Sequence, residues 1–171
     1  MIKEKKFLFA FLALFLAFTV VGCGKSLEQK AAEKYIEARS GGNVDIKDDG
    51  FSIKDEQGNE FSLQQGKELP EGWPSKVPYY KKGGIDQSSV MSLPGGKTFS
   101  VVILTDDSIE DIADYYKDEF EKENFNKNLE MNSDGSSLLG FEDDDLSVSI
   151  GISSDSGQQE ITQTIVEKTK E

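Results

Sequence analysis

The sequence predicts an α+β protein: an N-terminal helix and a small β-meander, then a mostly antiparallel sheet with one amphipathic helix packed on one face. Two observations lead to this fold class. Apolar residues recur at helical spacing over about residues 27–39 and again over about 108–120. Elsewhere, short runs of alternating apolar residues are separated by turn-forming Asp, Asn and Gly, which is typical of antiparallel strands.

Residues 1–22 have the layout of an export signal. Lys3, Lys5 and Lys6 precede the run Phe7–Val21, which is apolar except at Thr19. A membrane-spanning helix is the alternative, but it needs about 20 apolar residues, and this run has 15. The short run therefore favours a cleaved signal peptide.

The run ends in Val20-Val21-Gly22-Cys23, and Cys23 is the only cysteine of the chain. This segment resembles the lipobox of bacterial lipoproteins. The resemblance implies that the Cys23 thiol receives a diacylglycerol and that cleavage after the small Gly22 makes Cys23 the first mature residue. Each buried CH₂ of a fatty chain such as palmitate adds about 0.8 kcal/mol, so two or three chains hold a protein stably on a bilayer. We therefore expect a lipid anchor at Cys23 and a location on the extracytoplasmic face of the cell membrane.

The expected mature chain begins with a helix over about residues 27–39, which Gly41-Gly42 ends. Ser26 and Gln29 have the spacing of a capping box. Three short alternating runs then predict an antiparallel meander with one apolar face: Val44/Ile46, Phe51/Ile53 and Phe61/Leu63. We assign residues 23–66 to this lipid-anchored helix and meander, and residues 67–171 to an α+β module.

The module opens with a connector, residues 65–84, that contains three of the four prolines and is therefore extended. Residues 98–105 (TFSVVILT) predict a central strand buried on both faces. Ser108 and Asp111 form a capping box for the amphipathic helix that follows, and the acidic first turn suits the helix dipole. Four more strands are expected at Leu129/Met131, Leu139/Phe141, Leu146–Ile152 and Ile161–Val166.

Composition excludes several functions. The formal net charge is −13, and loss of residues 1–22 makes it −15, so we expect no nucleic-acid partner, because such binding relies on Lys and Arg. The chain has no histidine, and its lone cysteine is assigned to lipid. Ser-His-Asp and Cys-His catalysis, together with histidine or thiolate metal sites, are therefore excluded. We predict no catalytic residue, no cofactor and no metal site.

A longer resemblance begins at the connector. Leu69-Pro70-Glu71-Gly72-Trp73-Pro74, then Val77-Pro78-Tyr79-Tyr80, and later the helix segment DIADYYK (residues 111–117) are similar to a module of small bacterial lipoproteins. Those proteins combine a lipobox with an LPxxWPxxVPxY-type segment, one helix and β-hairpins. The resemblance covers about residues 69–166 and the signal. Lys81-Lys82 stands where the module has Pro-Gly, and no activity is implied.

Two stretches are candidates for a site. Trp73, Tyr79 and Tyr80 lie on a proline-stiffened segment, where aromatic residues either anchor a partner protein of the envelope or fold back onto the open end of the sheet. The acidic run Glu142–Asp145 either gathers a cation or is an ordinary acidic turn between strands.

We therefore expect a membrane-anchored lipoprotein with a non-catalytic binding or structural role at the cell envelope. The alternatives are a small hydrolase that uses carboxylates and a cation-binding module.

Overall fold

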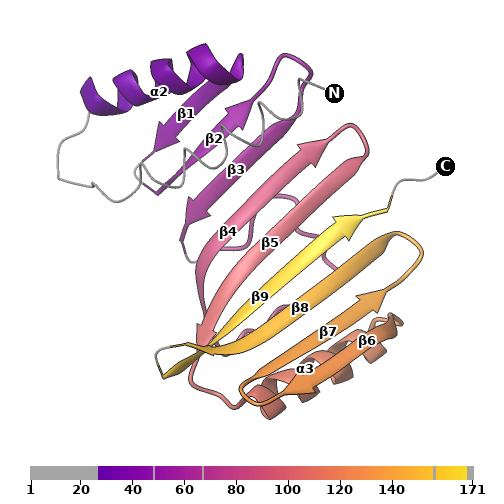
Figure 1. The fold of residues 1–171 in the computed structure, drawn as a ribbon. Coiled ribbons are helices and arrows are strands. Elements are labelled where there is room, and N and C mark those ends of the chain that lie inside the picture. Colours follow the sequence, from indigo (N-terminus) through magenta and orange to yellow (C-terminus); the bar gives the residue numbers. More distant parts are fainter. Residues whose placement is uncertain (1–26, 48, 67, 156, 169–171) are drawn as a thin grey trace.

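The computed structural model describes residues 27–168 apart from residues 48, 67 and 156. Within these residues, nine strands form one antiparallel sheet in the order β1-β2-β3-β4-β5-β9-β8-β7-β6 (Figure 1). The strands are β1 Asn43–Lys47, β2 Gly50–Lys54, β3 Glu60–Gln65, β4 Gly84–Leu93, β5 Gly96–Thr105, β6 Asn126–Ser133, β7 Ser136–Glu142, β8 Leu146–Asp155 and β9 Gln158–Glu167. The helices are α2 Leu27–Ser40 and α3 Ile109–Lys122. Neither described helix has the length and hydropathy that crossing a bilayer requires.

The predicted fold class is wrong in its architecture. The sequence was expected to give a small meander beside a separate sheet, but the protein is dominated by one continuous sheet. The continuity comes from β4, which pairs with β3 from Glu60↔Ser92 to Gln65↔Gln87 and with β5 on its other side. The sheet therefore runs across the boundary that we placed at residue 66.

Strand β4 was missed because its residues carry almost no apolar alternation. Its first half reads Gly-Ile-Asp-Gln-Ser-Ser, and the pairing with β5 shifts between Ile85 and Gln87 at a bulge. Most of β4 is polar on both faces, so neither face shows the period-two pattern from which strands are recognised. Its place in the sheet comes from backbone pairing with two neighbours.

Helix α3 forms as its sequence predicts and covers one face of the C-terminal strands. The Ser108 side chain accepts a 3.1 Å hydrogen bond from the Asp111 amide, which confirms Ser108 as the N-cap. The Asp111 carboxylate accepts a 2.6 Å hydrogen bond from the Ser108 hydroxyl, where a capping box would use the Ser108 backbone amide. The helix contacts β6, β7 and β8 and lies behind them in Figure 1. Its buried residues, Ile112, Ala113, Tyr116 and Phe120, pack into the core beneath it.

The core fills the space between α3, the connector and the sheet. Phe99, Val101 and Ile103 of β5 point into this core and are fully buried, whereas Val102 and Leu104 on the other face are only partly buried. The expectation that this strand is buried on both faces is therefore wrong. The Phe120 ring stacks on Phe141 at 4.3 Å between ring centroids, so aromatic rings occupy the space between helix and sheet.

Helix α2 protects the outer edge of the sheet. It contacts β1, and the Glu33 and Glu37 carboxylates accept hydrogen bonds from the Ile46 and Val44 amides at 3.1 and 3.4 Å. Uncovered edge strands invite pairing with other chains. The helix over 27–39 agrees with α2, while Ser26 of its predicted capping box lies outside the described residues.

The two halves of the sheet place their apolar residues on opposite faces. Leu63 pairs with Ser89, and Ser89 pairs with Ser100. Paired residues share a face, so Leu63 lies on the face of Ser100. This is the opposite face from Phe99 and the α3 core, because successive residues alternate.

Candidate functional site: the open face of the sheet

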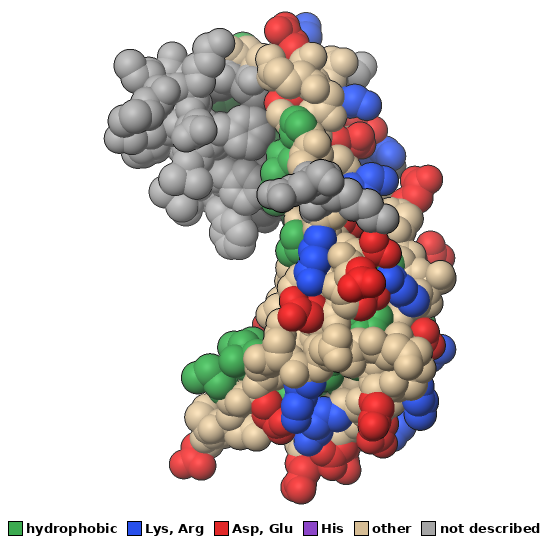
Figure 2. Space-filling view, turned by 90° about the vertical axis from the view of Figure 1, so that its right-hand side faces the viewer, with side chains coloured by type: hydrophobic (Ala, Val, Ile, Leu, Met, Phe, Trp, Pro, Cys, Tyr) green, Lys and Arg blue, Asp and Glu red, His purple; other side chains and the backbone are tan. Residues whose placement is uncertain are grey.

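The candidate site is the face of β5–β9 that lies opposite α3, which we call the open face. Helix α3 contacts β6, β7 and β8 on the other face. Met131 is 61% exposed and Leu129 is 39% exposed on this side. Figure 2 shows hydrophobic side chains gathered at its lower left, beside a hollowed outline, on the side that faces the viewer in Figure 1.

A row of hydroxyl groups crosses the middle of the open face. Ser89, Ser100, Thr164 and Ser149 are consecutive partners across β4, β5, β9 and β8. The Ser100 and Thr164 hydroxyl oxygens lie 3.4 Å apart. Beyond Ser149, the paired residue on β7 is Gly140, and the residue of β6 that pairs with Gly140 is Leu129. The row of hydroxyl groups therefore ends at an apolar side chain.

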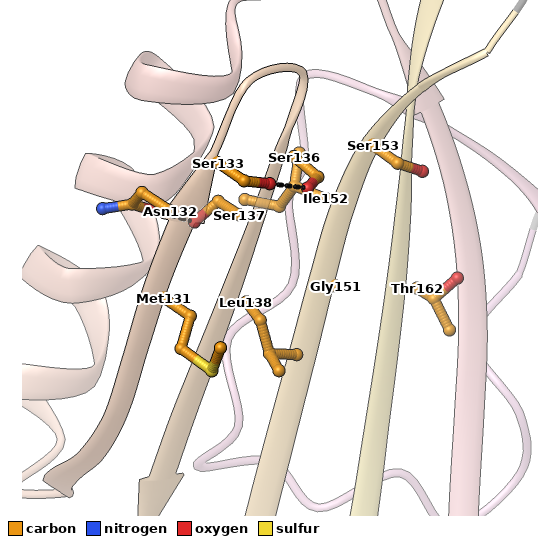
Figure 3. A pocket seen from close by; sticks show the side chains of 10 residues that line it. All are labelled: Met131, Asn132, Ser133, Ser136, Ser137, Leu138, Gly151, Ile152, Ser153 and Thr162. Atoms are coloured by element: carbon orange, nitrogen blue, oxygen red, sulfur yellow. Dashed lines mark hydrogen bonds between the residues drawn. The ribbon is translucent and has the colours of Figure 1, made fainter.

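A hollow of about 350 Å³ lies beside this row, near the tips of the two C-terminal hairpins. Met131 and Leu138 line one side with apolar side chains, and Ser153 and Thr162 lie on the other side (Figure 3). At the upper end, the Ser133 and Ser136 hydroxyls are 2.6 Å apart and hydrogen-bond to each other. The hollow therefore offers an apolar wall and a hydroxyl wall.

Gly151 explains why the hollow exists. It pairs with Thr162 of β9 and with Leu138 of β7, so it lies between the two walls. A Cβ atom built at Gly151 meets no atom within 4 Å. The absence of a side chain at this position therefore leaves the floor of the hollow open.

The open face is almost uncharged. On this face, two described side chains that lie beside Ser147–Ser153 of β8 are charged. They are Glu142 of β7, which pairs with Ser147, and Glu160 of β9, which pairs with Ser153. No residue that lines the hollow is charged, although 30% of the whole chain is Asp, Glu, Lys or Arg. Protein surfaces that face solvent normally carry charged residues, which keep the protein soluble. This nearly uncharged face is therefore suited to contact with an uncharged partner or ligand.

A second hollow, of about 390 Å³, lies on the other side of the sheet between β2–β5 and the connector. Its lining includes the basic residues Lys47 and Lys97 and the acidic residues Asp49, Glu60 and Glu71, together with serine and glutamine side chains. Both signs of charge are therefore present.

The predicted aromatic site residues have different environments. Tyr80 is fully buried, and its amide donates a 3.2 Å hydrogen bond to the Tyr116 hydroxyl. Its hydroxyl donates to Asp107, and burial, followed by this hydrogen bond, raises the pKa of Tyr80. Tyr80 thus offers no surface to a partner and fixes the connector to the core.

Trp73 and Tyr79 are half-buried. The Trp73 indole N–H donates a 3.0 Å hydrogen bond to the Val77 carbonyl, and its ring meets Phe99 edge-on at 6.4 Å between centroids. The Tyr79 carbonyl accepts a 2.8 Å hydrogen bond from the Tyr115 hydroxyl. Both residues thus fold back onto the core, and their role in binding a partner stays a prediction.

The acidic turn at residues 142–145 is held by lysines. Lys76 of the connector lies 2.5 Å from the Asp143 carboxylate and 3.7 Å from Asp145, and Lys168 lies 3.1 Å from Glu142. Burial alone would raise the pKa of Asp143, but hydrogen bonds from Lys76 and from the Asp145 and Leu146 amides lower it. Across the described residues, no group of three or more acidic side chains is arranged to hold a metal ion.

The predicted lipid attachment site Cys23 and its neighbour Gly22 lie outside the described residues. The open face was not predicted as a site, although the sequence contains its signal. In LSVSIGIS (residues 146–153), serine or glycine alternates with buried apolar residues, and in ITQTI (residues 161–165) two threonines alternate with the buried Ile161, Gln163 and Ile165. From these two segments we predicted strands and no site.

Comparison with known proteins gives one similarity. A family model described as START domain-like matches residues 87–161, which run from β4 through α3 into β9. This is less than half of the chain. No curated protein and no solved structure matches it.

Proposed function

We propose that this protein is a membrane-anchored lipoprotein on the extracytoplasmic face, with a non-catalytic role in which the open face binds a ligand or a partner of the envelope. The observation that carries the binding role is the nearly uncharged open face with its hollow at Gly151. The lipobox-like segment that ends at Cys23 carries the anchoring role.

The position of Cys23 supports a sheet held close to the bilayer. Cys23 is four residues before Leu27, where α2 begins. A fully extended chain spans at most about 3.6 Å per residue, so at most about 14 Å separates the lipid attachment from the start of α2. A ligand or partner of the open face would therefore be met near the membrane surface.

The electrostatics favour binding over carboxylate catalysis. A catalytic general acid needs a carboxyl group with a raised pKa. Among the described carboxylates, those with a shifted pKa are Asp55, Glu130 and Asp143. The pKa of each is lowered, and hydrogen bonds from neighbouring groups contribute to each shift. The space between α3 and the sheet, where a buried active site would lie, is filled by aromatic side chains.

The anchor is tested by labelling cells with radioactive palmitate and separating membranes from soluble protein. The wild-type chain should be labelled and should sediment with membranes. Cys23→Ser should lose the label and keep residues 1–22. Labelling and processing of Cys23→Ser at the wild-type level would contradict the anchor.

The binding role is tested by cross-linking in intact cells. Ser149 is exposed in the middle of the open face, so Ser149→Lys should reduce the capture of neighbouring molecules. Gln57→Lys, in the exposed turn between β2 and β3, is the control for added charge. Equal capture by both variants would contradict a role for the open face.

Trp73→Ala tests, in the same cross-linking experiment, the hypothesis that the connector aromatics anchor a partner. Unchanged capture by Trp73→Ala would remove the support for that hypothesis.

A further inference from the structure

We propose that the hollow at Gly151 binds a neutral saccharide that carries an apolar substituent, of which an N-acetylated hexose is the simplest kind. This inference rests on the proposed binding role of the open face and names the ligand class of that face.

The lining excludes a charged ligand. No charged side chain lines the hollow, and moving an ion out of water without a partner of opposite charge is costly. The surrounding protein carries a large net negative charge, which further opposes anions. A neutral molecule avoids this ionic desolvation cost, and the hydration that its polar groups lose is replaced by hydrogen bonds to the lining.

The two walls require a ligand with two kinds of surface. Met131 and Leu138 offer aliphatic contact, while Ser136, Ser153 and Thr162 offer hydroxyl groups. A hydroxyl group both donates and accepts hydrogen bonds, so a hydroxyl wall matches the hydroxyl groups of a sugar. The methyl group of an N-acetyl substituent matches the aliphatic wall.

Other occupants fit less well. A fatty acyl chain would cover the hydroxyl wall with groups that form no hydrogen bond, which costs free energy at each hydroxyl that it removes from water. A protein partner usually meets an anchor of Trp, Tyr or Arg, and none of these residue types lines the hollow. A small molecule with mixed polarity is the remaining class.

The size and shape set the expected affinity. Ligand sites commonly have volumes of about 300–1,000 Å³, and the hollow, at about 350 Å³, is at the lower end. It is open to solvent, because Met131 and Ser153 on its rim are exposed. We therefore expect one or two sugar rings to bind with a dissociation constant in the millimolar range, or about 4 kcal/mol.

The test is a titration of the full-length protein, kept in detergent micelles, followed by amide chemical shifts in NMR spectra. The probe is N,N′-diacetylchitobiose, and the charged control is chitobiose, which lacks the acetyl groups and carries amines. The wild-type chain should show saturable shifts at Gly151, Ser153 and Thr162 with the acetylated sugar and none with the amine.

Gly151→Leu provides the specific variant, because its side chain would fill the hollow without meeting another atom near its Cβ. Gly84→Leu is the matched control: Gly84 is in β4, is exposed, and likewise has no atom within 4 Å of an added Cβ. Gly151→Leu should abolish the shifts, and Gly84→Leu should retain them. Equal melting temperatures would show that both variants fold.

Three results would overturn the saccharide assignment: no saturable shift in the wild-type chain, shifts that Gly151→Leu retains, or equal binding of the amine control. Failure here is distinguishable from failure of the proposed function. If Ser149→Lys still lowers capture in cells while the sugar does not bind, the open face binds a different class of ligand. If capture is unaffected as well, both proposals fail.

Discussion

The Tyr116 hydroxyl of α3 donates a 3.0 Å hydrogen bond to the side-chain oxygen of Gln163 on β9. The Gln163 amide in turn donates a 2.8 Å hydrogen bond to the Pro78 carbonyl of the connector. Gln163 is fully buried, so one side chain joins the helix, the central sheet and the connector inside an apolar core. This network keeps the connector on the α3 side of the sheet and leaves the opposite face uncovered by it.

Replacing Gln163 by leucine should destabilise the protein strongly. The change leaves the Pro78 carbonyl without the Gln163 donor. The Tyr116 hydroxyl loses its acceptor, although it still accepts a hydrogen bond from the Tyr80 amide. A buried polar group left unpaired costs about 1–3 kcal/mol. We expect a loss of about 2 kcal/mol in the free energy of unfolding, measured by urea denaturation. Gln65→Leu, at an exposed position of β3, is the control. Similar losses in the two variants would show that the network contributes little.

Stability should fall at alkaline pH because of the buried tyrosines. Burial raises the pKa of Tyr116, and burial followed by the contact with Asp107 raises the pKa of Tyr80. In the unfolded chain a tyrosine ionises above about pH 10, whereas in the folded protein these two remain protonated. The stabilisation is therefore complete below about pH 10 and is lost as the pH rises further, at up to about 1.4 kcal/mol per pH unit for each tyrosine.

The measurement is the urea midpoint between about pH 9 and pH 12. Tyr80→Phe should flatten the decline relative to the wild-type chain, because phenylalanine has no proton to lose. A decline with the same slope in both proteins would mean that other groups control the alkaline transition.

Gly83 and Gly84 should respond differently to the same substitution. A Cβ at Gly83 would lie 2.5 Å from the Ile103 side chain and 2.8 Å from the Leu104 carbonyl oxygen, at the point where the connector joins β4. Overpacking of this kind costs about 1–3 kcal/mol. At Gly84 the added Cβ meets nothing within 4 Å. Gly83→Ala should therefore lower the melting temperature clearly, and Gly84→Ala should leave it within about 2 °C; the reverse order would contradict the packing at Gly83.

The two glutamates of α2 should slow amide exchange at the edge strand. Glu33 and Glu37 accept the hydrogen bonds of the Ile46 and Val44 amides, and each such bond contributes about 0.5–1.5 kcal/mol. Glu33→Ala should therefore speed hydrogen exchange at Ile46 by about 3- to 10-fold. Lys34→Ala, at an exposed position of the same helix, controls for a change in helix content. Unchanged exchange in Glu33→Ala would mean that α2 does not protect the edge.

Local chemistry made several elements predictable. Ser108 and Asp111 carry the cap of α3 within one turn, so the start of the helix needs no distant contact. In the strands at Leu139/Phe141 and Leu146–Ile152, every second residue is apolar because one face of each strand is buried in the core. In contrast, Gln163 looks like a surface residue in the sequence, since only the fold brings Tyr116 and Pro78 to its two polar atoms.

The sequence by itself indicated both described helices and every described strand except β4, and it predicts the lipid anchor at Cys23 from a contiguous segment. Only the tertiary structure decided that nine strands form one sheet and that Leu63 and Phe99 lie on opposite faces of it. The physical reason is that alternation shows which residues of one strand share a face, while the register with the neighbouring strand decides which face that is.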